Sequence, residues 1–85
     1  MKKFEYIITE PAGIHAIPAG LLVKEVSVYK SSITIERNGK IADGKRLMPI
    51  MALGVRCGEK VTFIIEGTDE DETAIKLESF CRKNL

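Results

Sequence analysis

Residues 13–19, with the sequence GIHAIPA, form the stretch in which the chain changes from loop to helix. Pro11 and Gly13 break the segment before it, whereas Pro18 fits the first turn of a helix, because the N–H group that proline lacks has no partner there. His15 is the only histidine of the chain. It lies just before a helix start, where free N–H groups and aligned peptide dipoles favour an anion.

An alternating segment precedes this stretch and an amphipathic helix follows it. Phe4, Tyr6 and Ile8 alternate with other residues, which predicts a strand over 4–8 with one buried face and a second, partly buried face. From residue 18 onward, apolar residues recur at helical spacing. The predicted inner stripe of this helix consists of Ala19, Leu22, Val23, Val26 and Tyr29.

A hairpin and a short helix come next. Residues 32–36 and 40–42 flank the dipeptide Asn38-Gly39, which favours a type I′ turn because both positions require positive φ. The segment 46–53 is short and dense in apolar residues, which predicts a helix of about two turns. The glycine that follows it, Gly54, would end that helix.

The last third of the chain predicts a buried strand over 61–65 and a final helix. Thr68-Asp69 followed by Glu72 resembles a capping box, in which side chains at a helix start bind its free N–H groups. Arg82 and the lysine after it would complement the dipole at the helix end. The predicted inner stripe consists of Ala74, Leu77 and Cys81, with Phe80 beside it.

The predicted order of elements is therefore β-α-β-β-α-β-α within a single domain, residues 1–85. A chain of 85 residues can form one modest core but not two. Four strands with interspersed helices predict an α+β sandwich, in which the helices cover one face of a mainly antiparallel sheet.

Composition excludes several classes of function. Thirteen basic and twelve acidic side chains nearly cancel, so the chain lacks the positive field that nucleic-acid binding requires. The sequence has neither an apolar run of about 18 residues nor an apolar signal segment. Membrane insertion is therefore not expected, and a cytoplasmic location is expected. Cys57 and Cys81 fit neither a disulfide framework nor a metal site and are expected to be buried or half-buried thiols.

In combination, these residues resemble the HPr phosphocarrier proteins of the bacterial sugar phosphotransferase system. The resemblance covers essentially the whole chain and implies an open-faced β-sandwich with four antiparallel strands and three helices. It rests on Gly13-Ile14-His15-Ala16, Pro18-Ala19, Asn38-Gly39-Lys40, Leu47-Met48 with Met51, Leu53-Gly54-Val55, and Gly67 before an acidic helix start.

The resemblance also implies a role for His15. Its Nδ1 atom would accept a phosphoryl group from phosphorylated enzyme I and pass it to EIIA components, while the N–H groups of Ala16 and Ile17 bind the phosphoryl oxygens. Imidazole suits this role because its ordinary pKa lies near neutral pH. The chain would be a carrier with a phosphohistidine intermediate rather than an independent enzyme, and it would require no metal or cofactor. A transcriptional regulator is a further candidate partner.

Several positions depart from the family pattern. An arginine, whose charge can pair with phosphoryl oxygens, usually occupies the position of Ile17, and a small polar capping residue usually occupies that of Ala12. Gram-positive relatives have a regulatory serine where this chain has Arg46, so that switch is expected to be absent. We expect Arg56 or Arg46 to supply part of the positive charge that position 17 lacks.

A docking surface is also expected around the histidine. Ile17 and Leu21 lie four residues apart and share a helix face other than the inner stripe. Methionine suits surfaces that accept several partners, although the Met-containing segment is equally compatible with the core, because its apolar run does not show which face is buried. The resemblance favours the docking role. The predicted docking surface consists of Ile17, Leu21, Leu47, Met48 and Met51.

Two functions therefore remain open. The presence of His15 together with Gly13 and Pro18 favours a phosphocarrier. Ile17 and Ala12 favour a regulatory or interaction module of the same fold, with weak or no phosphoryl transfer. An acid-labile, base-stable phosphate adduct on the histidine would distinguish the two.

Overall fold

The four strands of the chain pair into one antiparallel sheet in the computed structural model, which describes residues 1–85. They are β1 (Lys2–Ile7), β2 (Ser32–Arg37), β3 (Lys40–Asp43) and β4 (Lys60–Glu66). Their spatial order is β1-β4-β2-β3, so the last strand of the sequence lies inside the sheet and the first lies at an edge.

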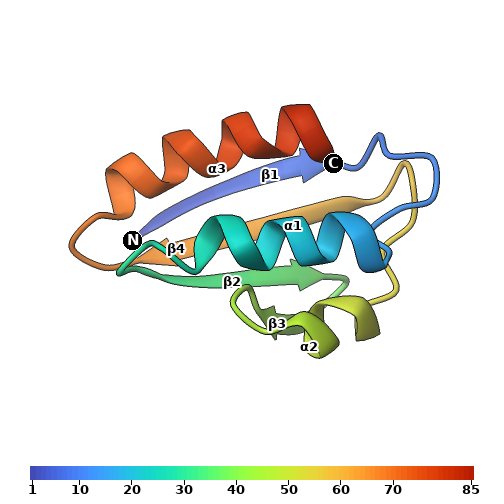
Figure 1. Ribbon diagram of the computed structural model, residues 1–85, viewed down its shortest axis with the longest axis horizontal. Helices are drawn as coiled ribbons and strands as arrows, with labels where there is room; N and C mark the ends of the chain where they lie inside the picture. The colour runs from blue at the N-terminus through green and yellow to red at the C-terminus, as the bar shows by residue number, and fades with distance from the viewer.

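Three helices cover one face of this sheet (Figure 1). They are α1 (Ala16–Val26), α2 (Leu47–Ala52) and α3 (Glu70–Asn84). Helix α1 packs between α2 and α3, and its first residue lies near the end of the molecule where α3 finishes. The predicted element order and the open-faced sandwich are confirmed. No helix combines the length and the apolar character needed to cross a lipid bilayer.

The core fills the layer between the helices and the sheet. Phe63 of β4 is fully buried, and its ring stacks on that of Phe4 in the neighbouring strand, with ring centroids 5.1 Å apart. Burying a large apolar side chain stabilises a fold by about 1.5–3 kcal/mol, so this layer dominates stability. The fully buried residues include Ile33, Ile35, Val61 and Ile65 from the sheet, and Leu22, Val26, Ile50, Leu77 and Cys81 from the helices.

The two turn predictions are confirmed. Asn38 and Gly39 join β2 to β3 with φ values of 50° and 81°, as a type I′ turn requires. Gly54 has a φ of 65° and follows the last turn of α2.

Two details at the ends of elements differ from expectation. Ile8 is buried just beyond β1, but Ile7 is exposed, so the prediction that the second face of this strand is partly buried is wrong. No layer covers that face of the sheet. Helix α1 begins at Ala16, directly after His15 and with Pro18 in its first turn as predicted. It ends at Val26, however, so half-buried Tyr29 lies beyond the helix, where its hydroxyl donates to Glu25 Oε2 at 2.7 Å.

The predicted capping box of the last helix is wrong. Asp69 occupies the N-cap position of α3, but its side chain makes no capping hydrogen bond. Its carboxylate instead accepts from the Ser31 hydroxyl and from the backbone N–H groups of Lys30 and Ser31, each N–H at 2.9 Å. These bonds, that of the Ser31 hydroxyl first, lower the pKa of Asp69 to about 2. Asp69 therefore ties the start of α3 to the start of β2.

The two cysteines have different environments. Cys81 is buried in α3, and this burial raises the pKa of its thiol to about 12. Cys57 is exposed, so the prediction of burial is wrong for this residue. It lies in the turn before β4, where its Sγ atom is 3.7 Å from the carbonyl oxygen of Thr9 at the surface.

Gly13 and Gly20 provide a matched test of backbone constraint. Gly13 has a φ of 71°, and a Cβ at this position would overlap the carbonyl oxygen of Val55, whereas a Cβ at Gly20 in α1 would meet nothing within 4 Å. We expect Gly13→Ala to lower the free energy of unfolding by about 3 kcal/mol. Gly20→Ala should raise it by about 0.5–1 kcal/mol. Urea titrations of the two variants measure both changes, and a neutral Gly13→Ala would contradict the close approach.

Candidate functional site

His15 stands at the N-cap position of α1, and the loop before it is held by main-chain hydrogen bonds on two sides. The N–H group of Ile14 donates to the carbonyl oxygen of Val55 at 3.0 Å. On the other side, the N–H groups of Thr9 and Glu10 donate to the main-chain oxygen of Leu85 at 2.7 and 2.8 Å. Contacts with the segment after α2 and with the end of α3 therefore position the histidine.

The start of α1 has unused hydrogen-bond donors. The histidine side chain makes no capping bond, and the first turn contains no acidic residue. The N–H groups of Ala16 and Ile17 have no acceptor within the chain, and Pro18 has no N–H group to offer. Two free donors and the positive end of an 11-residue helix dipole thus lie next to the imidazole, an arrangement that binds anions.

The imidazole of His15 is accessible and has one charged neighbour. Its side chain is 40% exposed, and its Nε2 atom lies 3.9 Å from Oε1 of Glu10. The Nδ1 atom makes no hydrogen bond within the chain. One ring nitrogen therefore faces a carboxylate, and the other is free to react. Sequence reasoning missed Glu10, because spacing along the chain does not show that the loop folds back toward the ring.

The predicted docking residues differ in how far they are exposed. Ile17 and Met48 are 70% and 71% exposed, and Leu47 is also exposed, so these three are accessible apolar side chains on the neighbouring helices α1 and α2. Met51 is half-buried and packs against the core, which gives the core interpretation of the Met-containing segment partial support.

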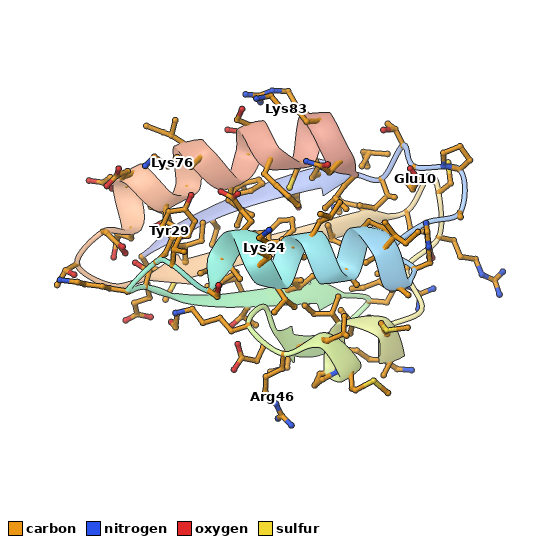
Figure 2. The ribbon with its side chains drawn as sticks, in the orientation of Figure 1. Glu10, Lys24, Tyr29, Arg46, Lys76 and Lys83 are labelled. Atoms are coloured by element: carbon orange, nitrogen blue, oxygen red, sulfur yellow. The ribbon has the colours of Figure 1, made fainter.

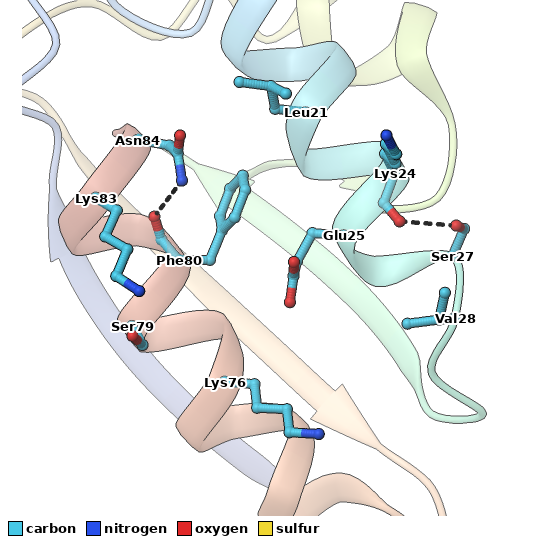
Figure 3. Close-up of a pocket in the computed structure, with 10 residues that line it drawn as sticks. All are labelled: Leu21, Lys24, Glu25, Ser27, Val28, Lys76, Ser79, Phe80, Lys83 and Asn84. Carbon is cyan, nitrogen blue, oxygen red and sulfur yellow. Dashed lines mark hydrogen bonds between the residues drawn. The ribbon is translucent and has the colours of Figure 1, made fainter.

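Leu21 borders a different feature. It lines a groove of about 670 Å³ between α1 and α3, and Figure 3 shows it across from Phe80. The lysines around this groove do not converge on one point in Figure 3. The residues that line it include Leu21, Lys24, Val28, Lys76, Phe80 and Lys83.

The two arginines considered for the site lie at different ends of α2. Arg46 is at the N-cap position of this helix, and Figure 2 shows it extending away from the molecule, well apart from Glu10. Arg56 follows the helix, and its Cα lies 2.9 Å from where a Cβ of Gly13 would be. Only Arg56 is therefore adjacent to the loop that carries the histidine.

An ion pair stabilises the segment that contains Arg56. The guanidinium of Arg37 donates to Glu59 Oε2 at 2.7 Å and to the carbonyl oxygen of Leu53 at 2.9 Å. The other carboxylate oxygen of Glu59 accepts from the N–H group of Arg56 at 2.7 Å. The Arg37 side chain in particular holds the pKa of Glu59 below its ordinary value. This charged network therefore fixes the segment that accepts the hydrogen bond of Ile14.

The structure contains no group of three His, Cys, Asp or Glu side chains that could hold a metal ion.

Comparison with known proteins identifies the family. A family model described as PTS HPr component phosphorylation site matches residues 2–83. The chain belongs to the HPr family. Its function follows from that membership and from its named relatives: it is a phosphocarrier of the phosphotransferase system and not an independent enzyme.

Individual HPr proteins are similar over most of their length. The phosphocarrier protein HPr of Mycoplasma capricolum is 42% identical over 72 residues, which cover 85% of this chain and 81% of the relative. That of Mycoplasma genitalium is 35% identical over 85 residues, covering 99% of this chain and 97% of the relative. The crystal structure of HPr-C-His from Thermoanaerobacter tengcongensis superposes with a TM-score of 0.93 at 36% identity, covering 99% of this chain and 94% of that one.

Proposed function

We propose that His15 is the residue on which this HPr protein carries the phosphoryl group, and that Nδ1 is the atom that receives it. The observation that supports this assignment is the position of an accessible imidazole beside two free N–H donors at the start of α1. Each donor can bind a phosphoryl oxygen, and the helix dipole favours the added negative charge. Phosphorylated enzyme I would supply the group and EIIA-type proteins would accept it, in the cytoplasm.

The transfer uses the lone pair of a neutral imidazole. Nδ1 attacks phosphorus, the bond between phosphorus and the leaving atom of the donor protein breaks, and its electron pair returns to that atom. The three phosphoryl oxygens are carried over intact, and Ala16 and Ile17 donate to two of them. The second transfer reverses these roles, with Nδ1 as the leaving atom.

We further propose that the partners dock on the apolar surface beside the histidine. Exposed Ile17, Leu47 and Met48 would form its centre, with Leu21 and half-buried Met51 at its margins. Burial of such side chains in a complex supplies binding energy, and the flexible methionines adapt to more than one partner. A transcriptional regulator could use the same surface.

We also propose that this chain is an atypical member of its family at position 17. Ile17 offers its main-chain N–H group but no side-chain charge, so the phosphoryl oxygens lack the bidentate partner that an arginine would provide. The proximity of the Arg56 backbone to Gly13 supports the proposal that Arg56 supplies part of that charge. A regulatory module with weak transfer is the alternative that Ile17 favours.

The test of the carrier function is direct phosphorylation. Incubation with phosphoenolpyruvate and the cognate enzyme I should give one acid-labile, base-stable phosphate per chain, detected by mass spectrometry, because phosphoramidates of histidine hydrolyse in acid. The adduct should be absent from His15→Ala. Absence of the adduct from the wild-type protein would instead support the interaction module.

Ile17→Arg tests the missing charge at position 17. We expect the variant to lengthen the lifetime of the phosphohistidine, or to speed its formation, by about fivefold. This is the change that corresponds to one exposed ion pair of about 1 kcal/mol. Ile75→Arg is the matched control, because Ile75 is 72% exposed but lies on α3. A slower reaction of Ile17→Arg alone would show that the apolar contact of Ile17 with a specialised partner surface matters more than the added charge.

Arg56→Ala and Arg46→Ala test which arginine compensates. Since only Arg56 adjoins the loop that carries His15, its removal should shorten the phosphohistidine lifetime by about threefold, an effect typical of one exposed charge. Arg46→Ala should leave the lifetime unchanged. Equal lifetimes in both variants and the wild type would remove the proposal that an arginine compensates.

A further inference from the structure

A carboxylate lies beside the ring nitrogen that phosphoryl transfer leaves unused. Oε1 of Glu10 is 3.9 Å from Nε2 of His15, longer than a hydrogen bond but within the range of direct charge attraction. Both side chains are partly exposed, so a small rotation can close the remaining distance. Contacts of this kind are often long in a free protein and shorten during reaction.

The main chain holds Glu10 in this place. Its N–H group donates to the Leu85 oxygen at 2.8 Å, and its carbonyl oxygen accepts from the N–H group of Gly13 at 2.8 Å. Its Oε1 atom also accepts a hydrogen bond from the N–H group of Ala12, at 3.5 Å. Figure 2 shows Glu10 in the loop at the end of the molecule where α1 begins. Bonds to both sides of the residue therefore restrict where its carboxylate can go.

We propose that Glu10 is a positioning residue for His15, whose carboxylate keeps the proton on Nε2 and so leaves the lone pair on Nδ1. In a neutral imidazole only one nitrogen carries a proton, and an acceptor beside Nε2 favours the tautomer with the proton there. This proposal rests on the proposed function of His15. It explains why Nδ1 rather than Nε2 is the atom that reacts.

The same carboxylate stabilises the product of the first transfer. When Nδ1 forms its bond to phosphorus, the ring nitrogen gives up its lone pair while Nε2 keeps its proton, so the ring becomes cationic. The phosphoryl group lies on the opposite side of the ring, where the free N–H groups of α1 bind its negatively charged oxygens. Glu10 faces the cationic side and compensates a charge that is absent before the transfer.

The first experiment measures the tautomer in the free protein. Nitrogen NMR at about pH 8, where imidazole is neutral, gives the share of His15 protonated at Nε2. We expect a large Nε2–H share in the wild type and a smaller one in Glu10→Gln, which has nearly the same shape but no charge. Glu10→Asp, which keeps the charge on a shorter side chain, should fall between the two. Equal shares in all three proteins would overturn the proposal.

The second experiment measures the rate of phosphorylation by enzyme I and phosphoenolpyruvate. Loss of one facing charge at this distance should slow Glu10→Gln by about tenfold. Glu66→Gln is the matched control, because it removes an exposed carboxylate at the far end of β4 and should react as the wild type does. A normal rate in Glu10→Gln overturns the role of Glu10 only, whereas absence of any adduct on wild-type His15 overturns the proposed function itself.

Discussion

The close approach of the loop before α1 to the segment after α2 is the constraint on which the rest of the site depends. Gly13 has no side chain, so its backbone can lie against that of Val55 and Arg56, and Ile14 can donate to the Val55 oxygen. The approach sets where α1 starts, and therefore where its free N–H groups and its dipole act. A helix that began one residue earlier or later would turn these donors away from the histidine.

Elements set by local pattern could be predicted from the sequence. The hairpin depends on the backbone preferences of Asn38 and Gly39, and the inner stripe of α1 depends on helical periodicity, so both follow from neighbouring residues. The position of His15 before a helix was predictable for the same reason. That all four strands form one antiparallel sheet came from resemblance to a family rather than from periodicity, and their order within that sheet was not predicted.

Features that depend on distant residues could not be predicted in this way. Asp69 has the sequence signature of a cap, but its carboxylate accepts instead from the N–H groups of Lys30 and Ser31, in the loop before the neighbouring strand β2. Cys57 is exposed because its turn lies at the surface, which composition does not reveal. The approach of Glu10 to His15 likewise follows from the hydrogen bonds of Leu85, at the other end of the chain.

The hydrogen bonds of Leu85 make the surroundings of the histidine depend on the folding of distant parts of the chain. They join the loop after β1 to the residue after α3, so they exist only where α3 is docked on the sheet. The environment of His15 therefore requires that both the first and the last third of the chain are folded. A chain in which only the last helix is undocked still contains the histidine but loses the bonds that hold Glu10 beside it.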